Sequence, residues 1–302
     1  MKRFLSLILS LLMVLSVCSA LAQDAATPTE VAYEPLPLSG PAPYAPIADA
    51  FGADGMSYDD GTLSIRIETD VAHGTNIYYV YVTLTDASQM RTAIAGSPKS
   101  KAKKPVLAMA EANNAVLAIN GDYFGYHTEG MIVRGGEQLR FNPHWMRDTL
   151  IIDENGDFNF LTFPMYASYN TMKTAFDSFE GEVREAFAFG PALIIDGEKA
   201  EFNYKEKTSC GYPTPAQRLA FCQLDTLSYL IVATEGPEQD KAAGLSIPQL
   251  TELCLAKGAK QAYNLDGGSS VTIILGGQRI NAPESKDRSV SDIIYFSTLR
   301  AQ

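Results

Sequence analysis

Two short polar stretches, each placed directly after a short apolar run, constrain most strongly how this chain folds. Residues 115–119 (Ala-Val-Leu-Ala-Ile) precede residues 120–124 (Asn-Gly-Asp-Tyr-Phe), and residues 259–263 precede residues 264–270 (Asn-Leu-Asp-Gly-Gly-Ser-Ser). A helical pattern comes before each apolar run. In sheets with helical crossovers, loops at the carboxyl ends of strands lie at one edge. The pattern therefore predicts that the two polar stretches meet in one pocket.

The rest of the pattern predicts a mixed α/β or α+β fold, a single compact domain of mixed twisted sheets and a few helices. Expected strands are rich in β-branched and aromatic residues and cover 63–67, 77–84, 115–119, 218–224, 228–234, 259–263, 271–275 and 293–296, with hairpins at 131–137 and 191–198. Helices are expected at 105–113 and 246–257. The second has Ser246 as N-cap, Pro248 in its first turn and Gly258 after its end.

Residues 1–22 have the order of a signal peptide. Lys2 and Arg3 form a basic start, residues 4–17 an apolar core, and residues 20–22 (Ala-Leu-Ala) a small-x-small cleavage site. We expect cleavage after residue 22 and a secreted or extracytoplasmic protein. The alternative is a lipoprotein anchor at Cys18, which the large preceding valine disfavours. No later stretch reaches the roughly 20 apolar residues of a membrane span.

Residues 23–48 contain six prolines and predict an extended, partly disordered linker. The predicted domain then covers residues 49–302. Loss of residues 1–22 changes the formal charge from −11 to −13, because it removes two bases and no acid. Such a chain repels nucleic acid, so no nucleic-acid partner is expected.

Three cysteines remain after residue 22, namely Cys210, Cys222 and Cys254. An odd number leaves at least one thiol unpaired within the monomer. Cys210 and Cys222 can close a loop in an exported protein, or all three can be buried thiols. No Cys-x-x-Cys motif is present, so neither a zinc ribbon nor a thioredoxin-like site is indicated.

The two polar stretches combine carboxylates, glycines and hydroxyls. Glycines allow backbone N–H groups to turn toward an anion, and the hydroxyls of Ser269 and Ser270 are rotatable donors. The structural alternative is a tight Asp-Gly-Gly turn at residues 266–268 and an Asx turn at Asp122. His127 follows the first stretch closely and is the histidine we expect near the site.

Several catalytic motifs are absent, which narrows the possible functions. The sequence contains no Gly-x-Gly-x-x-Gly, no Walker-type phosphate loop, no His-Glu-x-x-His and no Gly-x-Ser-x-Gly. Only three histidines occur, so Ser–His chemistry has little support.

An ordered series of motifs resembles the phosphodiester glycosidase family over roughly residues 60–300. The motifs are residues 120–124, Phe-Gly-Pro at 189–191, Arg-Leu-Ala at 218–220, residues 264–270 and Arg-Ser-Val at 288–290. The resemblance implies an exported hydrolase that releases a sugar, N-acetylglucosamine in the known activity, from a sugar-1-phosphodiester. Two positions depart from the family pattern: Leu219 replaces a threonine, and Ser269 replaces a third glycine.

This reaction class needs a cation on the phosphate and a carboxylate near the sugar carbon. The expected catalytic residues are Asp266 and Asp122, as nucleophile, base or orienting group, and Arg218, as the phosphate contact. The expected substrate-binding residues are Asn120, Gly121, His127, Arg134, Asn264, Gly267, Gly268, Ser269, Ser270 and Arg288. The expected partner is a sugar phosphate or a cell-envelope glycan, and no cofactor is required.

Two other functions remain open from the sequence. One is a non-catalytic envelope protein for carbohydrate binding or exopolysaccharide assembly that uses the same pocket. The other is a metal-dependent phosphodiesterase with Asp122 and Asp266 as ligands. Two carboxylates without companion histidines favour Ca²⁺ over a transition metal in that case.

Overall fold

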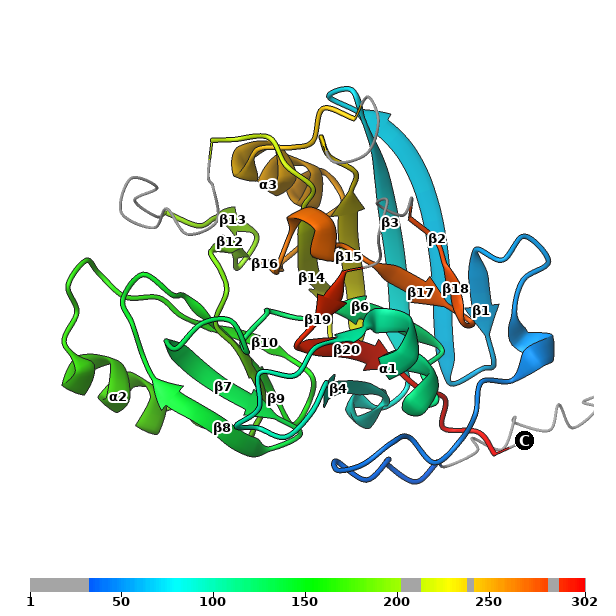
Figure 1. The fold of residues 1–302 in the computed structure, drawn as a ribbon, viewed down its shortest axis with the longest axis horizontal. Helices are drawn as coiled ribbons and strands as arrows, with labels where there is room; N and C mark the ends of the chain where they lie inside the picture. The colour runs from blue at the N-terminus through cyan, green and yellow to red at the C-terminus, as the bar shows by residue number, and fades with distance from the viewer. Residues whose placement is uncertain (1–32, 202–212, 238–241, 282–287, 302) are drawn as a thin grey trace, which may run out of the picture. The chain divides into compact units, whose positions relative to one another are not determined.

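The computed structural model describes residues 33–201, 213–237, 242–281 and 288–301 (Figure 1). From Glu34 onward the chain forms one unit. The predicted signal peptide, the first part of the predicted linker and Cys210 lie outside the described residues.

The largest sheet has eight strands in the order β1-β2-β3-β15-β14-β16-β12-β13. The strands are β1 (Ser57–Asp59), β2 (Leu63–Ala72), β3 (Thr75–Leu84), β15 (Ser228–Thr234), β14 (Leu219–Asp225), β16 (Gln261–Asn264), β12 (Ala192–Ile195) and β13 (Glu198–Lys199). The long β2–β3 hairpin is drawn in cyan in Figure 1. β16 places Asn264 opposite Ala220 of β14, so the second polar stretch begins at the end of a central strand.

A second sheet has five strands in the order β18-β17-β6-β20-β4. They are β18 (Gln278–Arg279), β17 (Ile273–Leu275), β6 (Leu117–Asn120), β20 (Asp292–Phe296) and β4 (Met90–Ile94). Strands β5 (Lys104–Pro105) and β19 (Ser289–Val290) pair with each other and form a separate two-stranded ribbon. β6 ends at Asn120, so this sheet supplies the first polar stretch.

A third sheet, which the sequence pattern revealed only in part, has the order β10-β9-β11-β7-β8. It consists of β10 (Phe158–Leu161), β9 (Thr149–Asp153), β11 (Val183–Phe187), β7 (Gly130–Arg134) and β8 (Glu137–Asn142). Helix α2 (Tyr169–Asp177) lies beside this sheet, as the green part of Figure 1 shows. Only the β7–β8 hairpin was expected.

Side-chain alternation along the strands explains how the layers pack. In β14, Leu219 and Phe221 face the main core between the sheets, whereas Ala220 and Cys222 face helix α3 (Ile247–Ala256). In β6, Leu117 and Ile119 face the main core and Ala118 faces helix α1 (Val106–Ala112). Each of these two sheets is therefore apolar on both faces, one against the other sheet and one against a helix.

Helices α1 and α3 lie where the sequence signals predict them, within one residue at each end, whereas α2 was not predicted. Ser246 caps α3 by accepting from Gln249 N, and the Gln249 side chain reaches back to complete a capping box. Gly258, with φ of 84°, follows its end. Three short 3₁₀ helices are also described, η1 (Ala48–Ala50), η2 (Ala87–Gln89) and η4 (Gly268–Ser270).

The mixed class is confirmed in broad terms, although the described residues are dominated by β-structure. The sheet type differs from the expectation, because every strand pair among the described residues is antiparallel. The prediction that the polar stretches meet assumed a sheet with helical crossovers, and that assumption was wrong. Neighbouring antiparallel strands from two packed sheets bring the polar stretches together instead.

The later part of the Pro-rich segment packs against the domain, unlike a linker. Leu36 and Ala42 are buried, and Leu36 N donates to Ser88 Oγ at 2.8 Å. The Arg91 guanidinium donates to the carbonyl oxygens of Pro37 and Gly40. The prolines do not prevent this packing. Proline lacks a backbone N–H, but the carbonyl oxygens of the segment can still accept hydrogen bonds from side chains of the domain.

Two of the cysteines lie in the interior. Cys222 of β14 and Cys254 of α3 are buried free thiols that lie beside each other. Burial raises the pKa of the Cys222 thiol, and the neighbouring Cys254 adds to the shift. Both thiols therefore contribute as small apolar side chains between the sheet and the helix.

Candidate active site

The two polar stretches lie together, as the sequence predicted. Asn120 Nδ2 donates to the carbonyl oxygen of Asp266 at 2.8 Å, and Asn120 Oδ1 accepts from Thr272 N at 3.1 Å. Asp266 N lies 3.4 Å from the carbonyl oxygen of Gly121. Asn120 thus uses both ends of its amide to fasten one loop to the other. Asn120 was expected to bind substrate, but in the structure its side chain positions the second loop.

Asp266 is the carboxyl group whose surroundings fit a chemical role. Burial raises its pKa to about 6, the negative charge of Asp122 adds to the shift, and Ser270 and Arg288 oppose it. Among the described residues, Oδ2 of Asp266 has no hydrogen bond of regular geometry, nor has the nearby Ser270 hydroxyl. A desolvated carboxyl with one oxygen outside regular hydrogen bonding is well placed to meet a reacting group.

Asp122 lies deeper, and both of its oxygens accept hydrogen bonds. Oδ1 accepts from Arg134 Nη2 at 2.8 Å and from Phe124 N at 3.1 Å, and Oδ2 accepts from Ala188 N at 2.8 Å. The contact with Phe124 is the expected Asx-type turn, so the structural interpretation of Asp122 holds alongside any chemical one. Direct attack by Asp122 stays a prediction.

Arg134 differs from its expected role in substrate binding. Its side chain is 4% exposed, and its guanidinium donates to Asp122, to Asp292 Oδ2 and to the carbonyl oxygens of Val133 and Ala186. These contacts use its five N–H donors. A buried guanidinium with no donor left cannot bind a substrate, so Arg134 positions the two carboxylates.

Asp292 is the member of this cluster that sequence reasoning missed. It is fully buried on β20, 2.7 Å from Arg134 Nη2, and burial raises its pKa despite the attraction of Arg134. A Cβ added at Gly121 would lie 2.2 Å from Asp292 Oδ2, which explains why position 121 is glycine. Its place shortly after Arg-Ser-Val at 288–290 was the available signal.

On one side of Asp266, Arg288 joins the two loops. Its Nη1 donates to Ser269 Oγ at 2.9 Å and its Nη2 donates to the Tyr123 hydroxyl at 3.0 Å. Lys103 Nζ donates to the same hydroxyl at 2.9 Å. Ser269, the departure from three glycines, therefore supplies a contact for Arg288.

His127 lies close to the first polar stretch. Arg147 Nη2 donates to His127 Nδ1 at 3.1 Å, and a guanidinium has only donors, so the neutral imidazole carries its proton on Nε2. Burial lowers the pKa of His127, and the charge of Arg147 lowers it further. The His127 ring is 6.3 Å from the rings of Tyr123 and Phe189. Sequence reasoning missed Arg147, which no motif marks.

Arg218 is buried, and the contacts described for it include backbone oxygens. Its Nε donates to Leu245 O at 2.9 Å and its Nη2 donates to Thr214 O at 2.7 Å. The expected phosphate contact of Arg218 stays a prediction. The neighbouring Leu219 points into the main core and does not line the site, so this departure from the family pattern is a matter of packing.

Position 267 requires glycine, because the backbone of residue 217 passes close by. A Cβ at Gly267 would lie 2.6 Å from Gln217 O, and Gly268 N donates to the same oxygen at 3.0 Å. Gly268 has a φ of 59°, which favours glycine. Asn264 Nδ2 donates to Gly190 O at 2.8 Å. These residues shape the loop, and their substrate contacts remain predictions.

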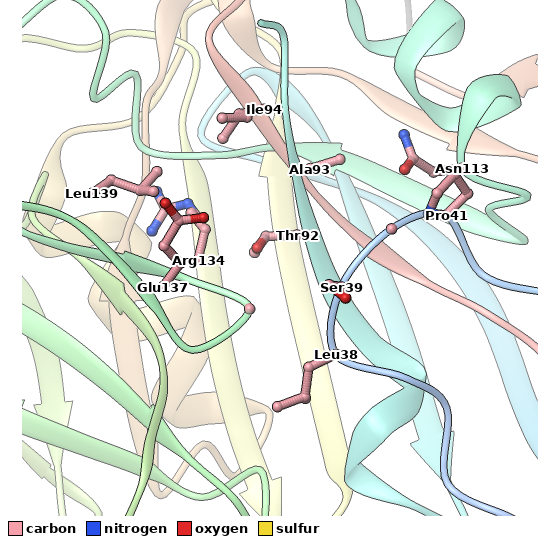
Figure 2. Close-up of a pocket in the computed structure, with 12 residues that line it drawn as sticks. Leu38, Ser39, Pro41, Thr92, Ala93, Ile94, Asn113, Arg134, Glu137 and Leu139 are labelled. Carbon is pink, nitrogen blue, oxygen red and sulfur yellow. The ribbon is translucent and has the colours of Figure 1, made fainter. Parts of the chain in front are cut away.

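The pocket in Figure 2 is a separate feature of about 330 Å³. Residues of the N-terminal segment, β4 and the β7–β8 hairpin line it, among them Ser39, Thr92 and Glu137. Of the site residues expected from the sequence, Arg134 alone lines it. The pocket therefore reaches the carboxylate cluster only at Arg134, and Asp266 does not line it.

Within the described ranges, no three His, Cys, Asp or Glu residues come together as a metal site would require. No helix in the same ranges is long and apolar enough to cross a membrane.

A desolvated aspartate beside a cationic side chain fits a site that acts on an anionic substrate. The chain belongs to the phosphodiester glycosidase family, whose model matches residues 113–297. That span includes both polar stretches, Arg134, Arg147 and Arg288. The family suggested by the sequence motifs is therefore confirmed.

Solved structures with the same fold include two of particular interest. The catalytic domain of zebrafish N-acetylglucosamine-1-phosphodiester alpha-N-acetylglucosaminidase, described as auto-inhibited by pro-peptide, has a TM-score of 0.61 at 17% identity, with 78% of this chain and 83% of that chain covered. A hypothetical protein from Synechocystis has a TM-score of 0.53 at 16% identity, with 78% and 62% covered. A search of curated proteins found no match. At these identities the likeness concerns the fold.

Proposed function

We propose that this protein is an exported hydrolase that cleaves a sugar-1-phosphodiester at the glycosidic carbon. The products are a free sugar, N-acetylglucosamine being the first candidate, and a phosphomonoester. The proposal rests on family membership for the reaction class and on the site for the residues. Export rests on the order of residues 1–22.

The observation that carries the proposal is the state of Asp266. Its carboxyl group is nearly buried, its Oδ2 makes no hydrogen bond of regular geometry with the described residues, and burial raises its pKa to about 6. At neutral pH it is ionised yet poorly solvated, which suits a nucleophile or a base toward water. Asn120 fixes its backbone, so the carboxylate is held in place before substrate arrives.

The chemistry of the leaving group agrees with the residues present. A phosphomonoester has a second pKa of about 6, so it departs more easily than the alcohol of an ordinary glycoside. Strong general-acid help is then less necessary than in the two-carboxylate mechanism of common glycosidases. One available carboxylate with cations close by is sufficient for the proposed reaction.

The roles follow from position. Asp266 acts at the sugar carbon, or on the water that attacks it. Arg288 lies beside Asp266 and attracts the phosphate, while the neutral His127 offers its Nε2–H to a sugar hydroxyl. Asp122, Arg134 and Asp292 form the buried support under the first loop.

The proposal is tested with a panel of sugar-1-phosphodiesters that differ in sugar and in aglycone. We expect at least one to yield free sugar and a phosphomonoester in equal amounts, with no turnover by the Asp266→Asn variant. Binding of the same compounds without any turnover would instead establish a carbohydrate-binding protein of the cell envelope.

A further inference from the structure

We infer that Lys103 and Arg288, held on either side of the Tyr123 hydroxyl, form the subsite that binds the phosphate group of the substrate. The inference rests on the proposed function for the identity of the ligand. It assigns a binding role to Lys103, which lies in the exposed, lysine-rich segment of residues 101–104. It also transfers the main phosphate contact from Arg218 to Arg288.

The first observation is the convergence of two cations on one oxygen. Lys103 Nζ lies 2.9 Å and Arg288 Nη2 lies 3.0 Å from the Tyr123 hydroxyl oxygen. The two nitrogens are therefore within about 6 Å of each other, where like charges repel. A phosphate group that accepts hydrogen bonds from both cations would place an attractive charge between them.

The second observation is the backbone strain that places Tyr123 there. Tyr123 has a φ of 60°, a conformation that bulky residues rarely adopt. Strain of this kind persists where the surroundings enforce it and is often found at functional sites. Here it directs the phenol toward the space between Lys103 and Arg288.

A third observation shows that the position of Lys103 is built into the fold. The antiparallel β5–β19 ribbon pairs Lys104 with Val290 and Pro105 with Ser289, so the two segments that carry Lys103 and Arg288 lie side by side. Lys103 Nζ also lies 4.7 Å from the ring centre of Tyr123 and 4.9 Å from that of Tyr126. These two rings stack at 4.7 Å, with an interplanar angle of 13°. The lysine is thus held by two aromatic faces and a hydroxyl.

The subsite is in the right place relative to the reacting group. Arg288 also donates to Ser269, three residues after Asp266, and its charge acts on the Asp266 carboxyl. A phosphate bound between Arg288 and Lys103 would place the attached sugar carbon toward Asp266. The subsite also offers a local positive field on a chain whose formal charge is −11, which favours capture of an anion at this point.

Binding of inorganic phosphate, measured by isothermal titration calorimetry on the whole mature protein, tests the inference without requiring turnover. We expect Lys103→Gln and Arg288→Gln each to weaken phosphate binding by about tenfold or more, since each removes a charge-assisted hydrogen bond. Lys103→Arg keeps the charge and should retain most of the affinity. Lys101→Gln, an exposed lysine two residues away, is the matched control and should bind like the wild type.

Tyr123→Phe provides a second measurement, because it removes the hydroxyl that positions both cations and keeps the ring. We expect weaker phosphate binding and a raised KM with a nearly unchanged melting temperature. Unchanged phosphate affinity in both Lys103→Gln and Arg288→Gln, or no phosphate binding by the wild type at millimolar concentration, would overturn the inference. Phosphate binding that depends on both residues, without hydrolysis of any sugar-1-phosphodiester, would leave the subsite standing and refute the proposed function.

Discussion

Arg134 Nη2 lies 2.8 Å from Asp122 Oδ1, and both side chains are almost wholly buried. The same guanidinium also pairs with Asp292. One cation therefore pairs with two carboxyl groups beneath the loop that carries Tyr123 and His127. The strength of this support follows from burial, because each partner would be left charged and desolvated without the others.

Replacement of Arg134 by methionine should therefore be severe. Arg134→Met leaves Asp122 and Asp292 without their cation, and we expect a loss of about 3–5 kcal/mol in the free energy of unfolding, measured with urea. Arg66→Met is the matched control, because Arg66 pairs with Glu68 on the surface, with side chains 56% and 42% exposed. That variant should lose less than about 1 kcal/mol. Equal losses would show that the buried pair has no special weight.

Glu185 predicts how stability depends on pH. It is buried on β11, accepts from Thr92 Oγ1 and Gly135 N, and burial raises its pKa to about 7. Because the folded pKa exceeds the unfolded value of 4.5, the stability linked to this group is complete below pH 4.5 and is lost as pH rises through about 7. Glu185→Gln should therefore lose less melting temperature than the wild type between pH 5 and pH 8. Parallel losses in the two proteins would contradict this assignment.

Asp266→Asn keeps the shape of the side chain and removes its charge. We expect kcat to fall by about 10³-fold or more, while affinity for a sugar 1-phosphate stays within about tenfold, since the lost interaction acts mainly in the transition state. Asp225→Asn, a change at an exposed position on β14, is the control and should retain wild-type turnover. A variant at position 266 that keeps turnover would remove Asp266 from the mechanism.

The pH dependence of kcat/KM should report the ionisation of Asp266. Its pKa is raised to about 6, and the proposed role needs the ionised form. The rate should therefore rise with pH through about 6 and then level off, because a phosphodiester keeps one negative charge over this range. A rate that falls as pH increases from 5 to 7 would mean that Asp266 acts as an acid.

The sequence predicted the loops of the site better than the support beneath them. The order of motifs placed Asp266, Asp122 and Arg288 in one region, because the two aspartates follow short apolar strands and Arg288 begins a recognisable tripeptide. Asp292 was missed although it closely follows the Arg-Ser-Val motif, and Arg147 lies in no motif; the roles of both arise from contacts with residues distant in the sequence. Arg134 was misassigned for the same reason.

The fold shows a similar division. Helix α3 and the β14–β15 hairpin follow from capping residues, alternation and turn signals, all of which act locally. Strands β9 and β11 were not predicted. β9 is a short, almost wholly buried run, and in β11 Glu185 takes a position that alternation would give to an apolar residue. Tertiary contacts with Thr92 and Gly135 explain why the chain tolerates it there.

The central claim is that bond cleavage occurs at the sugar carbon. Hydrolysis of a sugar-1-phosphodiester in water enriched with ¹⁸O, followed by mass spectrometry of both products, tests it most directly. The account predicts one ¹⁸O atom in the free sugar and none in the phosphomonoester. Label in the phosphate instead would show attack at phosphorus, which would make the protein a phosphodiesterase and contradict the role of Asp266.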